Sequence, residues 1–226
     1  MIIDMESPRI LIFDVNETLL DLAGLRSVFA DALGGGERLA EWFFRLLHGS
    51  LVANATDSFR SFETIGVEAL RAVALTQEQE LSDRDARQLV AGFRSLPPHP
   101  DVPGGLSRLA GAGFRLVALS NGSPSGIRSQ LTHAGIVDRF ERIVSVEEAG
   151  RFKPDPAPYR LTLAHLGAEP AEALMVAAHD WDIIGARAVG IPGAFVTRPG
   201  VVWTVPQPRP DHTPANLAEL ASELGS

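Results

Sequence analysis

An aspartate follows an apolar run near the start of the chain, in the segment ILIFDVNETLL at residues 10–20. The run predicts a buried strand, so Asp14 should lie at its carboxyl end, where open α/β sheets have their active sites. A carboxylate there can act as a nucleophile, because it can form an ester and divide one difficult displacement into two easier ones. Asn16 follows two residues later, and its amide cannot serve as the general acid that an aspartate would be. Taken alone, Asp14 is equally consistent with a turn or a helix cap.

Polar side chains follow three further apolar runs. In chain order they are Ser120 and Asn121, then Lys153 with Tyr159, and then His179, Asp180 and Asp182. Each has an ordinary structural explanation by itself, as a turn, a solvated lysine, a packed ring or a helix cap. All of them lie at the same end of successive predicted strands, however. This arrangement favours one site that joins a nucleophile, a hydroxyl, a lysine and a carboxylate.

The elements that must position these residues alternate along the chain. Apolar runs at 10–13, 116–119, 143–146, 174–177 and 194–196 predict strands, and patterns at 104–112, 124–134, 156–166, 181–189 and 216–224 predict helices. This alternation predicts an α/β fold, with a parallel sheet flanked by helices and right-handed crossovers. From about 22 to 96, apolar residues recur at helical spacing only. We expect a helical cap at 21–97, inserted into a core of residues 1–20 and 98–226, where it would exclude water from Asp14.

Composition limits the function classes. The chain has 226 residues, a net charge of −8 and no cysteine. The acidic balance argues against nucleic acids and anionic membranes as partners. The lack of cysteine excludes disulfides, thiolate metal ligands and cysteine nucleophiles. No apolar run approaches the roughly 20 residues of a membrane span, and the start of the chain lacks a signal-peptide pattern. We therefore expect a soluble, cytoplasmic protein.

The motifs together resemble those of the haloacid dehalogenase superfamily. The matching segments are DVNET from Asp14, SNG from Ser120, KP at Lys153 and an acidic loop ending at Asp182. The resemblance spans almost the whole chain and implies a Rossmann-like core with an inserted helical cap. Most members are magnesium-dependent phosphatases, with an aspartate two residues after the nucleophile and a metal-binding acid four residues before the last acidic position. Here these positions hold Asn16 and Ala178, and alanine cannot ligate a cation that needs oxygen donors.

Both changes make the chain similar to the type II, or L-2-haloacid, dehalogenases, which need no metal or other cofactor. The segment LSNGSP at 119–124 resembles their second motif, and FKP at 152–154 followed by Tyr159 resembles their third. Phe59 and Phe62 match an aromatic pair in their cap. The resemblance implies that Asp14 attacks the carbon that bears the halogen, with inversion. A water then hydrolyses the resulting ester at the carboxyl carbon of Asp14.

The resemblance also implies roles for the other residues. Lys153 would keep Asp14 ionised, since a nearby cation lowers a carboxylate's pKa, and Asp182 would activate the water or hold Lys153. Thr18 and Ser120 would orient the substrate carboxylate or the oxygens of Asp14. The residues expected around the substrate, the halide and Lys153 are Asn16, Phe43, Phe62, Asn121, Tyr159 and His179.

The chain departs from the dehalogenase pattern at two places. Those enzymes carry an arginine after a cap tryptophan, where it draws off the halide, whereas Phe43 follows Trp42 here. A neutral ring cannot stabilise a leaving anion in this way. Arg45 and Arg60 are the residues that could reach in from another turn instead. In the fourth motif, the sequence AAH at 177–179 replaces hydroxyl and amide residues. His179 is equally consistent with a catalytic and a structural role.

Three functions therefore stay open. The first is metal-independent dehalogenation of small 2-haloacids. The second is a magnesium-dependent phosphatase acting on a small phosphate ester, with a metal site from Asp14 and Asp180 or Asp182. The third is a hydrolase or binding protein for another small carboxylate. Family members are often homodimers, although nothing in the periodicity of this chain marks an interface.

Overall fold

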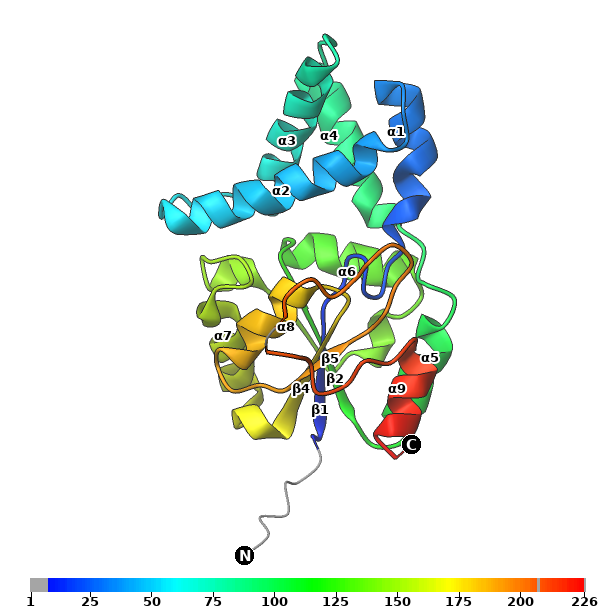
Figure 1. Ribbon diagram of the computed structural model, residues 1–226, viewed down its shortest axis with the longest axis vertical. Helices are drawn as coiled ribbons and strands as arrows, with labels where there is room; N and C mark the ends of the chain where they lie inside the picture. The colour runs from blue at the N-terminus through cyan, green and yellow to red at the C-terminus, as the bar shows by residue number, and fades with distance from the viewer. Residues whose placement is uncertain (1–7, 207, 226) are drawn as a thin grey trace, which may run out of the picture.

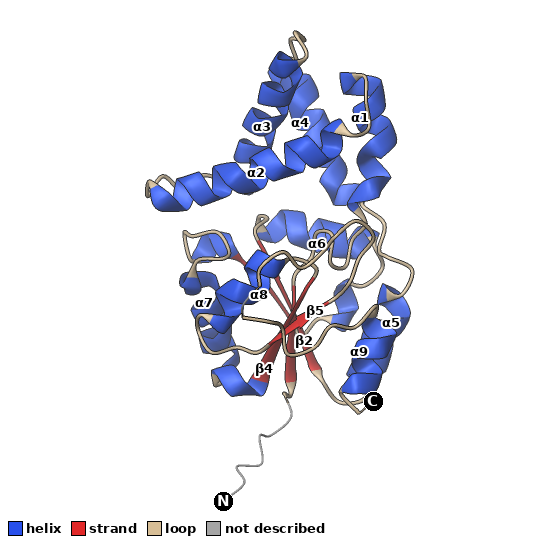
Figure 2. Ribbon diagram, viewed as in Figure 1, coloured by secondary structure: helices blue, strands red, loops and turns tan. Residues whose placement is uncertain are grey.

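The structure is a computed structural model that describes residues 8–206 and 208–225. Its centre is a five-stranded sheet in which all neighbouring strands are parallel (Figure 1, Figure 2). Across the sheet, the strands are β3 (Arg142–Ser145), β2 (Arg115–Ser120), β1 (Ile10–Phe13), β4 (Ala173–Ala177) and β5 (Gly193–Phe195). All five predicted strands are thus confirmed, each to within one residue at either end.

One set of helices flanks the sheet, and a second set forms a separate layer above it (Figure 1). The flanking helices are α5 (Val102–Gly111), α6 (Pro124–His133), α7 (Pro156–Leu166), α8 (Asp180–Arg187) and α9 (Leu217–Glu223). The upper layer contains α1 (Arg26–Leu33), α2 (Arg38–Ala55), α3 (Phe62–Thr76) and α4 (Asp83–Ala91). Short 3-10 turns are η1 (Leu22–Leu25), η2 (Gly92–Ser95), η3 (Val137–Arg139), η4 (Val146–Glu148) and η5 (Pro170–Glu172). In the described part of the chain, no helix combines the length and the apolar character needed to cross a membrane.

The sheet forms because its strands are apolar on both faces. Every residue of β1 is buried, and Leu11 pairs with Leu116 of β2 on one side and with Leu174 of β4 on the other. Successive residues of a strand point to opposite faces, so a strand that is buried throughout needs helices over both faces of its sheet. Figure 1 shows this arrangement, with α7 and α8 on one side and α5 and α9 on the other.

The stretch from 22 to 96, all of which is described, contains helices and no strand, as its spacing predicts. Trp42 of α2 lies at the centre of this layer. Its ring packs against Phe29 and Phe93, at centroid distances of 4.9 and 5.1 Å, and its indole N–H donates to the backbone oxygen of Gly66 at 2.8 Å. The layer therefore has an aromatic centre of its own.

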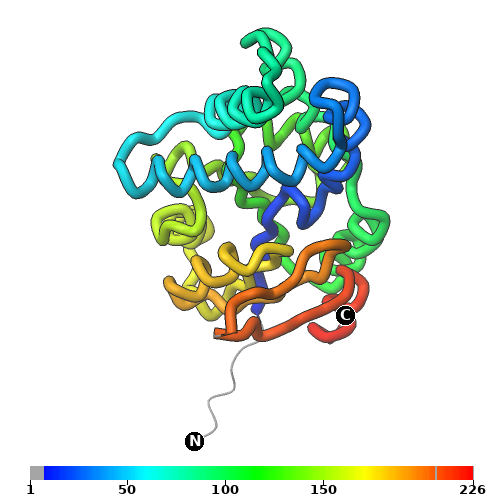
Figure 3. Tube along the Cα trace, turned by 45° about the horizontal axis from the view of Figure 1, so that its top comes forward, coloured from blue at the N-terminus to red at the C-terminus, as the bar shows by residue number. Residues whose placement is uncertain are grey.

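Helix α2 runs across the carboxyl ends of the strands (Figure 1, Figure 3). Near its end, the Asn54 side chain accepts from Phe152 N at 2.9 Å and donates to Phe152 O at 2.8 Å. Arg151 adds a bond to the backbone oxygen of Asn54 at 2.8 Å. Where the layer joins the sheet, Leu20 pairs with Pro98 in an antiparallel bridge. These contacts hold the helical layer over the strand ends that bear the predicted site.

Candidate active site

Asp14 directly follows β1, in the middle of the sheet. The strand order reverses between β1 and β4, and open α/β sheets bind ligands in the crevice at such a point. The backbone N–H of Asp14 donates to Val176 O at 3.0 Å, which continues the pairing with β4. Thr18 Oγ1 donates to Asp14 Oδ2 at 2.6 Å and accepts from Ala178 N at 2.9 Å. The Thr18 hydroxyl therefore joins the turn after β1 to the end of β4 and holds the Asp14 carboxylate.

The ammonium group of Lys153 connects two carboxylates. It donates to Asp14 Oδ1 at 2.9 Å, to Asp182 Oδ2 at 2.6 Å and to Leu119 O at 3.0 Å. All three of its hydrogens thus have acceptors. The backbone N–H of Lys153 donates to Asn121 Oδ1 at 3.0 Å, which ties this loop to the end of β2. The side chain is only 1% exposed, and a buried ammonium is tolerated because it is paired.

Asp182 lies in the first turn of α8 and is fully buried. Its Oδ1 accepts from the Tyr159 hydroxyl at 2.5 Å, and its Oδ2 accepts from Lys153. Both oxygens of this carboxylate therefore have donors from the protein. Asp180 is bonded elsewhere, because its Oδ2 accepts from the backbone and the hydroxyl of Thr204.

The mutual charges determine which of these groups are ionised. Burial by itself raises the pKa of Asp14, but Lys153 and His179 outweigh it and hold that pKa far below the ordinary value. Burial by itself would lower the pKa of Lys153. The charges and hydrogen bonds of Asp14 and Asp182 outweigh burial, so the pKa of Lys153 is raised above its ordinary value. For Asp182, burial dominates and raises the pKa despite the contact with Lys153. Asp14 is therefore an anion beside a cation, as a carboxylate nucleophile must be.

His179 bridges Asp14 and Glu17. Its Nδ1 lies 3.2 Å from Asp14 Oδ2, and its Nε2 lies 2.9 Å from Glu17 Oε2. The Trp181 ring stacks on the imidazole with a centroid distance of 4.9 Å, and the Phe43 ring approaches from α2 at 6.1 Å. Burial lowers the pKa of His179, but the hydrogen bonds to the two carboxylates outweigh it and raise that pKa to about 9. At neutral pH His179 is an imidazolium that donates to both.

This raised pKa predicts a pH-dependent contribution of His179 to stability. The pKa rises from about 6.5 in the unfolded chain to about 9 in the folded one, so the contribution is complete below pH 6.5 and is lost as the pH rises through 9. We expect the free energy of unfolding to decrease over this window by on the order of 3 kcal/mol more in the wild type than in His179→Asn. Urea unfolding between about pH 6 and 9.5 measures this difference. Equal slopes in the two proteins would contradict it.

The other predicted polar residues lie around this cluster in different ways. Ser120 Oγ accepts from Gly122 N at 3.3 Å, and its hydroxyl hydrogen has no acceptor among the described residues. The Nδ2 amide of Asn121 likewise has no acceptor in the described part of the chain. The Oδ1 of Asn16 accepts from Gln130 of α6 at 2.8 Å. Ser120 and Asn121 thus keep free donors, whereas Asn16 joins the turn after β1 to a helix.

The predicted aromatic residues separate into two groups. Phe43 faces His179, as described above. Phe62 and Phe59 pack instead on Phe152, the residue before Lys153, with centroid distances of 6.0 and 4.7 Å. The helical layer therefore contacts Phe152 through an aromatic cluster and His179 through the Phe43 ring.

The suggestion that Arg45 or Arg60 replaces the missing cap arginine is wrong. Arg45 lies two residues after Phe43, which places it on another side of α2, and it pairs with Glu41 at 3.0 Å. Arg60 pairs with Glu68 at 2.6 Å, and both of those side chains are about half exposed. The positive charges beside Asp14 come from Lys153 and His179.

Two neighbours of this cluster, Glu17 and Trp181, were not predicted from the sequence. Glu17 stands in the same motif as Asp14, and this shared position is the signal that could have identified it. Its backbone has a φ of 61°, a conformation that few residues other than glycine adopt. Trp181 lies over His179 and within 5.8 Å of Lys153 Nζ. Nothing in the local sequence indicates that its ring turns toward the site.

Comparison with known proteins agrees with this geometry. The chain matches the haloacid dehalogenase-like hydrolase family over residues 8–190. An (S)-2-haloacid dehalogenase of Pseudomonas sp. strain YL is 30% identical over 201 residues, which are 88% of this chain and 87% of that protein. The (S)-2-haloacid dehalogenase H-109 of Pseudomonas putida is 29% identical over 216 residues, 95% of this chain and 96% of its own length.

Solved structures show the same fold. An L-2-haloacid dehalogenase from Xanthobacter autotrophicus, with chloropropionic acid covalently bound, aligns with a TM-score of 0.91 and 24% identity over 97% of this chain and 99% of that one. A dehalogenase in an intermediate complex aligns with a TM-score of 0.90 and 26% identity over 97% and 98%. The family match covers most of the sequence, and the resemblance found in the motifs is confirmed. The chain therefore belongs to the haloacid dehalogenase-like hydrolases.

Proposed function

We propose that this protein hydrolyses small 2-haloalkanoic acids to 2-hydroxy acids through an ester on Asp14, without a metal ion. The observation that supports this most is the ionised, buried Asp14 carboxylate, held by Lys153 and Thr18 at the end of β1. A halide leaves as a stable anion and needs no proton, unlike an alcohol leaving a phosphate ester. Asn16, which cannot act as an acid, fits that requirement. The activity named for the similar (S)-2-haloacid dehalogenases supports the same substrate class.

The first step is attack by Asp14 on the carbon that bears the halogen. Asp14 Oδ1 accepts one hydrogen bond, from Lys153, whereas Oδ2 accepts from both Thr18 and His179. Oδ1 therefore keeps a lone pair and is the better nucleophile. A new bond forms between Oδ1 and this carbon while the carbon–halogen bond breaks, and the halide takes the bonding electrons. Attack from the back of that bond inverts the carbon.

The second step is hydrolysis of the ester. Water attacks Cγ of Asp14, and the bond from Cγ to the alkylated oxygen breaks. That oxygen leaves with the substrate carbon, takes one proton of the attacking water and becomes the hydroxyl of the product. The water oxygen stays on Asp14, and the second water proton is released when the carboxyl group ionises again. The full cycle releases one halide and one proton. Because Asp182 is fully buried and contacts both Lys153 and Tyr159, we assign Asp182 to holding Lys153 rather than to activating the water.

Substrate binding uses the free donors at the end of β2 and the rings above them. The Ser120 hydroxyl and the Asn121 amide are suited to bind the substrate carboxylate and the departing halide. The Phe43 and Trp181 rings close the space over His179. In this proposal, residues 21–97 act as a cap on a core of residues 1–20 and 98–226. A closed apolar cover of this kind suits a substrate of a few carbons.

The hydrogen bonds that the carboxylates of this site accept support a reaction without a metal ion. Both oxygens of Asp14 and both oxygens of Asp182 accept hydrogen bonds from side chains, and Asp180 bonds the loop at Thr204. Among the described residues, no three His, Asp or Glu side chains are grouped to hold a metal ion. The carboxylates that a phosphatase would use for magnesium thus have other partners here.

Halide release from L-2-chloropropionate and chloroacetate in excess EDTA tests the proposed function. We expect steady release of chloride together with the 2-hydroxy acid. No release with EDTA, but phosphate release from small esters with magnesium, would favour the phosphatase alternative. If neither reaction occurs, the site acts on or binds another small carboxylate.

A further inference from the structure

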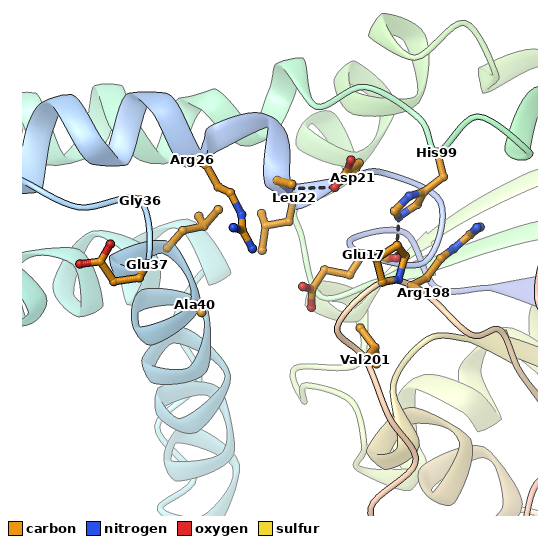
Figure 4. A pocket seen from close by; sticks show the side chains of 13 residues that line it. Glu17, Asp21, Leu22, Arg26, Gly36, Glu37, Ala40, His99, Arg198 and Val201 are labelled. Carbon is orange, nitrogen blue, oxygen red and sulfur yellow. Dashed lines mark hydrogen bonds between the residues drawn. The ribbon is translucent and has the colours of Figure 1, made fainter.

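His179 is held between two carboxylates of unequal exposure. Nδ1 lies 3.2 Å from Asp14 Oδ2, inside the site, and Nε2 lies 2.9 Å from Glu17 Oε2. The His179 side chain is 9% exposed and that of Glu17 is 28% exposed. Glu17 also lines a pocket together with Asp21, Arg26 and His99 (Figure 4). The imidazole thus connects the nucleophile to a carboxylate that meets solvent.

The ester intermediate changes the charges around His179. While Asp14 is free, both hydrogen-bonded carboxylates favour the imidazolium. Once Asp14 is alkylated it is neutral, and Glu17 is the one remaining anion bonded to His179. Lys153, on Asp14 Oδ1, and Asp182 behind it are further charged groups nearby. Around Glu17, the pocket lining adds Asp21, Arg26, His99 and Arg198. From helix α2, the neutral Phe43 ring faces His179.

Hydrolysis of the ester places a negative charge next to His179. When water attacks Cγ, electrons move to the carboxyl oxygen that is not esterified. In the proposed first step this is Oδ2, which has Thr18 Oγ1 at 2.6 Å and His179 Nδ1 at 3.2 Å. Donors already aimed at a developing oxyanion stabilise the transition state strongly, because they need no rearrangement.

We propose that Glu17 keeps His179 protonated while Asp14 is esterified, so that His179 stabilises the oxyanion formed at Asp14 Oδ2. This inference rests on the proposed function. His179 is then a catalytic residue, and Glu17 is a positioning residue that acts through it. No atom is transferred between the two, because the imidazolium donates hydrogen bonds throughout.

The backbone at Glu17 is held in an uncommon conformation. With φ at 61°, its peptide groups are fixed by two bonds: its N–H donates to Leu20 O at 2.9 Å, and its oxygen accepts from His99 Nε2 at 3.0 Å. A non-glycine residue in this region costs energy, and such residues cluster at functional sites.

Rapid mixing of Glu17→Gln with L-2-chloropropionate separates the two chemical steps. We expect the first turnover of chloride release to stay close to the wild-type rate, since Asp14 itself still keeps His179 charged. The following steady rate should fall about 10- to 100-fold, the usual effect of losing a hydrogen bond to a charged partner. Alkylated enzyme should accumulate and be visible by intact-protein mass spectrometry. The steady rate should recover as the pH is lowered, because protonation then no longer depends on Glu17.

Asp21→Asn is the matched control, since Asp21 lines the same pocket but bonds Ala23 N instead of His179. This variant should behave like the wild type in both phases. The proposal is overturned if Glu17→Gln keeps the wild-type steady rate, or if both of its phases slow equally.

A second measurement needs no substrate and therefore separates this inference from the proposed function. Asp14→Asn removes the charge that alkylation removes. The imidazole NMR signal of His179, identified by its loss in His179→Asn, should titrate in Asp14→Asn with a pKa above the ordinary value. In the Asp14→Asn/Glu17→Gln double variant, that pKa should fall below the ordinary value, because burial then dominates. The same pKa in both would overturn the role of Glu17, whatever the enzyme hydrolyses.

Discussion

Asp14→Asn should abolish halide release while leaving the fold intact. The asparagine oxygen can still accept from Lys153 and Thr18, but a neutral amide is a far weaker nucleophile than a carboxylate. We expect turnover to fall by on the order of 10⁴-fold or more, as when a nucleophile is removed from a catalytic group. Chloride release from L-2-chloropropionate measures the rate, and circular dichroism with thermal unfolding monitors the fold.

Asp180→Asn is the control for this prediction. Asp180 lies in the same acidic loop as Asp182, but its oxygens bond Trp181 N and Thr204 rather than Asp14. Its substitution should leave turnover near the wild-type level. Near-normal rates in Asp14→Asn, or a complete loss in Asp180→Asn, would show that the nucleophile has been assigned to the wrong residue.

Lys153→Met should have the largest effect on stability. The change leaves Asp14 and Asp182 buried together without the cation that they share. Removing one partner of a buried ion pair costs about 3–5 kcal/mol, because the remaining charge has no compensation. The pKa of Asp14 should rise as well, so that the remaining activity is lost first at acidic pH. Urea unfolding and a pH–rate profile measure the two effects.

A second substitution tests the cause of that loss. Asp182→Asn in the Lys153→Met background removes one of the two unpaired carboxylates. We expect part of the lost stability to return, although activity should not, because Lys153 also holds Asp14 in place. Additive losses from the two substitutions would mean that these residues are not coupled.

The strands and their polar ends could be predicted from local patterns. A run such as 10–13 is apolar at every position, and this property belongs to the segment itself, so its assignment required no knowledge of its neighbours. Parallel strands end at one edge of their sheet, so the nucleophile, the hydroxyl, the lysine and the carboxylate were expected to lie together. The contacts of Lys153 with Asp14 and Asp182 agree with that reasoning.

Helix faces and side-chain partners were harder to predict. The pattern of α2 predicted a helix, but whether Phe43 or Arg45 meets the site depends on how the helix rotates over the sheet. Asn16 was expected near the substrate, yet it bonds Gln130, which is 114 positions away in the chain. Such a partner belongs to a separate element, and its approach depends on the packing of α6 against the helical layer.

The sequence by itself determined the fold class, the strand ends and the identity of the ionisable groups, because each depends on residues close together in the chain. Only the tertiary structure decided that His179 lies between Asp14 and Glu17. That contact joins residues 162 positions apart, and it exists because β1 and β4 are neighbours although the chain between them forms two other strands. The protonation of His179 follows from the same contact, since burial and two carboxylates compete there to set its pKa.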